Sequence, residues 1–63
     1  MEIRCGITGN YYIYSSVKCE VSIVCDDIGK SISSIYWNKR YKKWVARVKL
    51  KSHKKLLKMK GWI

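Results

Sequence analysis

Apolar and polar side chains alternate with a period of two along most of the first half of the chain. The alternation covers residues 3–7, 11–17 and 19–25, and the last range places Val21 and Ile23 on one side. This period is typical of strands that bury one face. Gly9 and Asn10 form a turn signal after the first range. The first half therefore predicts two or three antiparallel strands.

The clearest strand pattern lies at residues 44–51. Even positions there hold Trp, Ala, Val and Leu, whereas odd positions hold Val45 and then only Arg or Lys. One face of this strand is thus apolar and the other basic. Residues 33–37 are predicted as its partner strand, and residues 38–43 as the hairpin connection. The turn type stays open, because the connection contains Asn but no Gly.

Residues 52–63 fit two different structures. As a strand they direct Leu57 and Met59 inward, and as a helix they place Leu56, Met59 and Ile63 on one face. The short length and a glycine near the end favour the strand.

These patterns predict one mainly β domain over residues 1–63. It should contain five to six short antiparallel strands and end in a three-stranded basic sheet. The alternative is an α+β fold with a short C-terminal helix at about residues 52–62.

Charge divides the chain into two unlike halves. Residues 1–29 hold two basic and four acidic side chains, a formal charge of −2. Residues 30–63 hold twelve basic side chains and no acid, a charge of +12, so the whole chain carries +10. We therefore expect a near-neutral β scaffold at residues 1–29 and a basic binding half at residues 30–63.

The basic half predicts a surface for a polyanion. Lys and Arg contacts to phosphates supply most non-specific affinity for nucleic acids, and interleaved Tyr and Trp can stack on bases. A nucleic-acid-binding protein is therefore expected, with double-stranded DNA preferred over RNA and with some base contacts beside the phosphate contacts. The expected interface residues are Tyr36, Trp37, Lys39, Arg40, Lys42, Lys43, Arg47, Lys49, Lys51, Lys58 and Lys60.

Two of the three tryptophans have different expected roles. Trp44 shares its parity with Ala46 and Val48 and is expected in the core. On the partner strand, either Tyr36 or Trp37 faces away from the core, and whichever does so joins the binding surface.

Residues 33–48 read Ser-Ser-Ile-Tyr-Trp-Asn-Lys-Arg-Tyr-Lys-Lys-Trp-Val-Ala-Arg-Val and resemble the opening of an AP2-type DNA-binding domain. The similarity is to the short versions found in phage proteins and in HNH homing endonucleases. Residues 54–59 resemble the third strand of that family, so the resemblance covers about residues 33–60. It implies a three-stranded antiparallel sheet lying in the DNA major groove. By position it implies contacts from Tyr36, Trp37, Arg40, Arg47, Lys49 and Lys58.

The chain departs from that family pattern at two kinds of position. The usual glycines at the strand start and in the hairpin are Ser34 and Lys42 here. No helix is predicted after the third strand, so the apolar parity of residues 1–29 is expected to cover the sheet instead. The basic hairpin is also similar to the arm-site-binding sheet of some tyrosine integrases, which implies the same class of function.

Metal binding and catalysis find little support. Cys5, Cys19, Cys25 and His53 lack the close pairing of zinc ligands, and the cysteines alternate as small hydrophobes. No phosphate-binding glycine loop is present, and the lone histidine lies among cations. We expect no enzyme, no metal and no cofactor.

The expected location is intracellular, because the odd cysteine count is unlike a disulfide framework and no signal-like or membrane-spanning apolar run occurs. An alternative function is a small viral-type regulator that binds an acidic host protein surface. A basic amphipathic helix on a membrane is a third interpretation, although no membrane partner is expected. A homodimer is compatible with a β-ribbon binder of this size.

Overall fold

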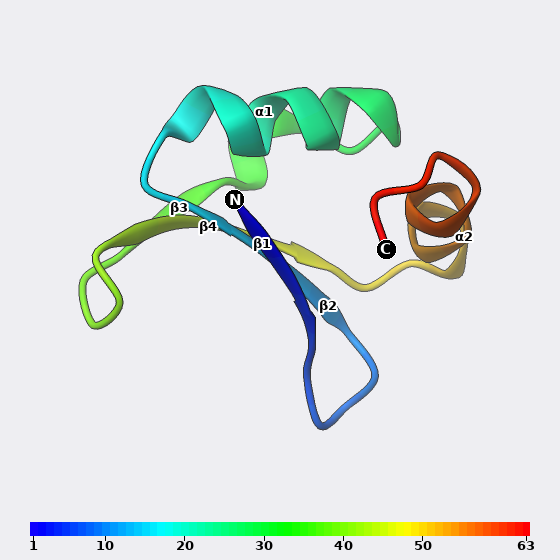
Figure 1. Ribbon diagram of the computed structural model, residues 1–63, viewed down its shortest axis with the longest axis horizontal. Coiled ribbons are helices and arrows are strands. Elements are labelled where there is room, and N and C mark those ends of the chain that lie inside the picture. The colour runs from blue at the N-terminus through cyan, green and yellow to red at the C-terminus, as the bar shows by residue number, and fades with distance from the viewer.

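Four short strands form one antiparallel sheet in the computed structural model, which describes residues 1–63 (Figure 1). The spatial order is β1-β2-β4-β3, so the sheet consists of two hairpins whose second strands pair with each other. The strands are β1 (Glu2–Cys5), β2 (Tyr11–Ser15), β3 (Tyr36–Asn38) and β4 (Lys43–Val48). The helical elements are α1 (Lys18–Asp27), the 3-10 turn η1 (Ile32–Ser34) and α2 (Lys51–Met59).

The helix α1 covers one face of this sheet. It connects the two hairpins, and Figure 1 shows it running along one side of the strands. The helix α2 lies beyond the C-terminal end of β4 (Figure 1). The core fills the space between α1 and the sheet, and Leu57 of α2 completes it. The buried core residues are Ile13, Val21, Val24, Cys25, Ile28, Ile35, Ala46, Val48 and Leu57.

The expected hairpin of the basic half forms, but its strands are shorter than predicted: residues 33–34 lie in η1, and β4 ends at Val48, before α2 begins at Lys51. Strands β3 and β4 pair antiparallel, with Trp37 opposite Trp44. The side-chain oxygen of Asn38 accepts hydrogen bonds from the backbone N–H groups of Arg40 (3.0 Å) and Tyr41 (3.1 Å). Asparagine thus organises this turn without a glycine, while Lys42 takes the left-handed conformation with φ of 52°.

The prediction of a strand at residues 19–25 is wrong, because this segment lies in α1. Val21, Val24, Cys25 and Ile28 are buried at spacings of i, i+3, i+4 and i+7, which is one face of a helix. Ile23 shares their apolar character but is 60% exposed. The apparent period of two at residues 19–25 therefore arises because this helix also has apolar residues on its outer surface.

The strand favoured at residues 52–63 is also wrong. Residues 51–59 form α2, which buries Leu57 and partly buries Leu56. The helix ends at Met59, and Gly61 follows its C-cap Lys60 with a φ of +79° that lets the Trp62 N–H reach the carbonyl of Leu57 at 2.9 Å. The helix is favoured over the strand because the segment consists mostly of good helix formers and can bury two leucines on one side.

The fold is consequently α+β, close to the alternative with a C-terminal helix. A small single domain with antiparallel strands is confirmed, but there are four strands rather than five or six. The C-terminal three-stranded basic sheet does not form, since residues 54–59 are helical and the third neighbour in the sheet is β2. Each half of the chain contributes two strands, and α1 rather than first-half strands covers the sheet.

The C-terminal segment is fastened to the end of α1. The carboxylate of Asp27 accepts hydrogen bonds from the Trp62 indole N–H (2.8 Å) and from the Lys60 ammonium (3.1 Å). These two donors lower the pKa of Asp27, the Trp62 hydrogen bond most strongly. Asp27 therefore joins α1 to the segment that follows α2.

Candidate nucleic-acid interface

The face of the sheet opposite α1 is covered by neither helix, and we call it the open face. Cross-strand partners point to the same side of a sheet, so the register assigns its members. Tyr14 pairs with Val45 and Val45 with Tyr36, while Tyr12 pairs with Arg47 and with Arg4. The open face thus consists of Glu2, Arg4, Tyr12, Tyr14, Tyr36, Asn38, Lys43, Val45 and Arg47.

Tyrosine rings dominate the middle of the open face. The rings of Tyr12 and Tyr14 stack with centroids 6.3 Å apart, and Tyr41 of the β3–β4 turn approaches Tyr14 edge-on at 6.1 Å. Val45 lies between Tyr14 and Tyr36 in register and is fully buried, although it is not part of the core beneath α1. Side chains on the open face therefore cover Val45 and form a second, shallow apolar layer.

Gly6, in the turn after β1, leaves room for the ring of Tyr12. A Cβ atom on Gly6 would lie 2.7 Å from the Tyr12 ring, closer than side-chain contacts allow. The absence of a side chain at Gly6 therefore lets the Tyr12 ring lie against the β1–β2 turn.

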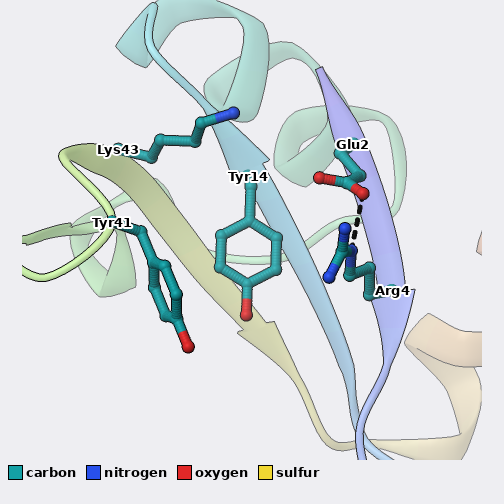
Figure 2. A pocket seen from close by; sticks show the side chains of 5 residues that line it. All are labelled: Glu2, Arg4, Tyr14, Tyr41 and Lys43. Atoms are coloured by element: carbon teal, nitrogen blue, oxygen red, sulfur yellow. Dashed lines mark hydrogen bonds and ion pairs between the residues drawn. The ribbon is translucent and has the colours of Figure 1, made fainter.

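One end of the open face holds a hollow of about 210 Å³, lined by Glu2, Arg4, Tyr14, Tyr41 and Lys43 (Figure 2). In Figure 2 the Tyr14 ring stands between Tyr41 on one side and the Glu2–Arg4 pair on the other. The Arg4 Nε donates to Glu2 Oε1 at 2.5 Å, and this hydrogen bond raises the pKa of Arg4. The hollow therefore combines a paired carboxylate with aromatic walls and hydroxyl groups.

Burial raises the pKa of Tyr14, and the neighbouring Tyr41 raises it further. A tyrosine hydroxyl is protonated at neutral pH even at its ordinary pKa, and the raised pKa of Tyr14 extends that state to more alkaline pH. A neutral phenol can donate a hydrogen bond to a ligand as well as accept one.

The other end holds a hollow of about 420 Å³, which we call the basic hollow. Its cations come from three segments: Lys30 follows α1, Arg47 lies in β4, and Lys49 leads into α2. No acidic side chain lines it, and Ser34 and Tyr36 complete the wall. Three positive charges around one hollow attract an anion by Coulomb forces, and no carboxylate in its wall offsets them.

The expected interface residues divide among several places. Tyr36, Lys43 and Arg47 lie on the open face, and Lys49 lines the basic hollow beside it. The remaining cations lie elsewhere: Lys39, Arg40 and Lys42 in the β3–β4 turn, and Lys51, Lys58 and Lys60 in or just after α2. Lys60 is engaged by Asp27. The structure therefore does not gather all eleven residues on one surface.

Of the two adjacent aromatics on β3, Tyr36 is the one on the open face. Trp37 lies on the α1 side, where its ring meets that of Trp44 edge-on at 5.3 Å. Trp44 itself packs against the core, as expected from its parity. The ammonium group of Lys18 lies 4.9 Å from the centre of the Trp44 ring on this covered side.

The cationic and aromatic residues of this region that were not expected at the interface are Arg4, Tyr12, Tyr14 and Lys30. The sequence did carry a signal for the first three, because they occupy the parity opposite Ile3 and Ile13. What it did not show is that β2 pairs with β4, which brings this parity onto the same surface as Arg47.

No three His, Cys, Asp or Glu side chains are gathered closely enough to hold a metal ion. Cys25 is buried, and burial raises the pKa of its thiol, whereas Cys5 and Cys19 are exposed and free. Neither helix has the length and apolar character required to cross a membrane.

The chain matches no protein-family model, no curated protein and no solved structure.

Proposed function

We propose that this protein is a small DNA-binding protein and that the open face is its interface. The observation that carries the proposal is the composition of this uncovered sheet surface. Tyrosine rings from β2 and β3 lie on it together with Arg4, Lys43 and Arg47, and its one carboxylate is already paired with Arg4.

Phosphate contacts supply most of the affinity in this proposal. Lys43, Arg47 and Lys49, with Lys30 at the rim, provide four cations along the length of β4 and its neighbours. The turn cations Lys39, Arg40 and Lys42 extend the positive field beyond one end of the face. Positive side chains arranged along a line match the regular spacing of phosphates on a nucleic-acid backbone.

Arginine at position 47 has an additional use in this interface. Arg47 pairs in register with Tyr12, and its side chain is exposed and lines the basic hollow. A planar guanidinium can bind a phosphate with two parallel hydrogen bonds or read a guanine edge. We therefore assign Arg47 the largest single polar contribution.

Fluorescence anisotropy with labelled DNA across a salt series tests the proposal. Four phosphate contacts predict that log affinity falls against log salt with a slope of about −3 to −4. Arg47→Gln should weaken binding roughly threefold or more and make the slope shallower by about one unit at most.

The matched control is Lys18→Gln, which removes one positive charge from the α1 side of the molecule. It should leave affinity within about twofold, because exposed charges on the far side are largely screened. Absence of binding at low salt, or equal losses from the two variants, would refute the open face as the interface.

A further inference from the structure

We infer that the open face binds a single strand, with unpaired bases stacked on its tyrosines and phosphates held in the basic hollow. This inference rests on the proposed function and specifies its ligand. It departs from the duplex DNA that residues 33–60 favoured as a sequence. Three features support it: the uncovered tyrosine rings, the cations of the basic hollow, and the carboxylate of Glu2 at the opposite end of the open face.

The tyrosine rings are placed to contact base faces rather than base edges. Tyr14 and Tyr36 flank Val45 on neighbouring strands and are therefore about 10 Å apart at the backbone. Tyr36 is 45% exposed, and Tyr12 and Tyr14 continue the aromatic surface across β2. The faces of bases in an intact duplex are covered by their neighbours in the stack. Rings on an uncovered sheet can therefore stack only on bases that are unpaired.

The basic hollow supplies the phosphate site beside these rings. Tyr36 belongs both to its wall and to the open face, so a base on Tyr36 would have its own phosphate next to Lys30, Arg47 and Lys49. The three cations come from separate segments and converge on one side of the ring. This arrangement fits one nucleotide: a ring for the base and a cationic hollow for its phosphate.

The opposite end of the open face offers a phosphate a weaker site. The hollow there is lined by Lys43 and by Glu2 and Arg4, which pair with each other, together with the hydroxyl-bearing rings of Tyr14 and Tyr41 (Figure 2). Lys43 is thus its one unpaired cation, against three in the basic hollow, whereas a base edge could use both hydrogen-bond donors and acceptors there. A duplex presents phosphates along both of its sides, so it fits this asymmetry less well than one strand does.

Anisotropy with two probes of equal length tests the inference. The probes are single-stranded oligo(dT) of about ten nucleotides, within the site sizes known for single-strand binders, and a duplex of the same length. The single strand should bind at least about tenfold tighter at the same salt concentration. Oligo(U) in a third series distinguishes the two sources of a single strand, and preference for either strand over the duplex supports the inference.

Two substitutions of the exposed Tyr36 distinguish aromatic stacking from non-specific apolar contact. Tyr36→Leu removes the ring, and loss of one stacked base should weaken single-strand binding by about fivefold or more. Tyr36→Phe keeps the ring and should bind within about twofold of the wild type. Circular dichroism of both variants shows that the fold is retained, which the exposure of Tyr36 makes the expected result.

Failure of the single-strand inference can be distinguished from failure of the proposed function. Equal or tighter binding of the duplex, or equal affinities of the Leu and Phe variants for oligo(dT), overturns the inference and leaves the proposed function standing. Failure of both probes to bind at low salt overturns the proposed function with it.

Discussion

Lys42 occupies a backbone conformation that favours glycine, at the end of the turn between β3 and β4. Its φ is 52°, and it is the only residue other than glycine with a positive φ. An L-residue in this region costs about 1 kcal/mol relative to glycine. The chain thus has a cation where the backbone would favour glycine. A charge at this cost agrees with the proposed role of the turn in binding a polyanion.

Lys42→Gly should therefore raise the free energy of unfolding, by about 0.5–1 kcal/mol. Urea denaturation followed by tryptophan fluorescence measures it. The control is Lys39→Gly in the same turn, which removes the same charge at a residue without a positive φ. That change should be neutral or destabilising, so equal stabilisation by both variants would show that charge rather than backbone strain is responsible.

Asp27 predicts a defined acid dependence of stability. Its pKa is lowered in the folded state, so its contribution is present above the unfolded pKa and is lost as pH falls through the lower, folded pKa. Asp27→Asn should be less stable than the wild type at neutral pH, and the difference should shrink below about pH 4. Urea denaturation between pH 7 and pH 2 measures this, and a constant difference over that range would contradict the assignment.

Among the elements, α1 shows how a period of two can mislead. Its inner residues Val21, Val24 and Cys25 carry the helical spacing, but Cys19 and Ile23 add apolar side chains on the outer surface. Both periods are therefore present in the same ten residues, and the alternation looked like a strand. Gly29, with φ of +74°, marks the end of the helix and was available as a stop signal.

The sequence predicted local features better than the arrangement of the elements. The β3–β4 hairpin, the inward position of Trp44 and the turn at Gly9 and Asn10 all follow from nearby residues, and the structure has them. The pairing of β2 with β4 joins residues 29 to 37 positions apart and leaves no local pattern. For that reason Tyr36 and Arg47 were expected at the interface, whereas Tyr12 and Tyr14 were not.

The helix α2 is held to the domain chiefly through one buried side chain. Leu57 is fully buried in the core, while the neighbouring Met59 is 70% exposed. Leu57→Ala should lower the free energy of unfolding by about 2–5 kcal/mol, which is enough to unfold much of so small a domain. Met59→Ala should change it by less than about 0.5 kcal/mol. Thermal melts of both variants, followed by circular dichroism, measure this, and similar melting temperatures would contradict the packing of α2.

At the scale of the whole molecule, a charge of +10 on 63 residues opposes folding through self-repulsion. Screening by salt reduces this repulsion, and a bound anion reduces it further. The melting temperature should therefore rise by several degrees between about 20 mM and 300 mM sodium chloride, and phosphate at equal ionic strength should raise it more. A melting temperature that falls with salt would contradict the account of the charge.

The charge is also distributed by the fold rather than by the two halves of the chain alone. Acidic Asp27 fastens the basic C-terminal segment, and basic Arg4 from the first half reaches the open face. The tyrosines that form the centre of this face come from both hairpins. The proposed binding surface thus depends on the assembled sheet, and its central feature is the row of Tyr14, Val45 and Tyr36 beside Arg47.

Titration of the 15N-labelled protein with oligo(dT), followed by two-dimensional NMR, tests the open face most directly. We expect saturable shifts at the backbone amides of Tyr12, Tyr14, Tyr36, Val45 and Arg47. The amides of Cys19 and Ile23, on the outer surface of α1, should stay in place. Saturable shifts that centre on α1 or α2 and leave these five amides unchanged would contradict the account.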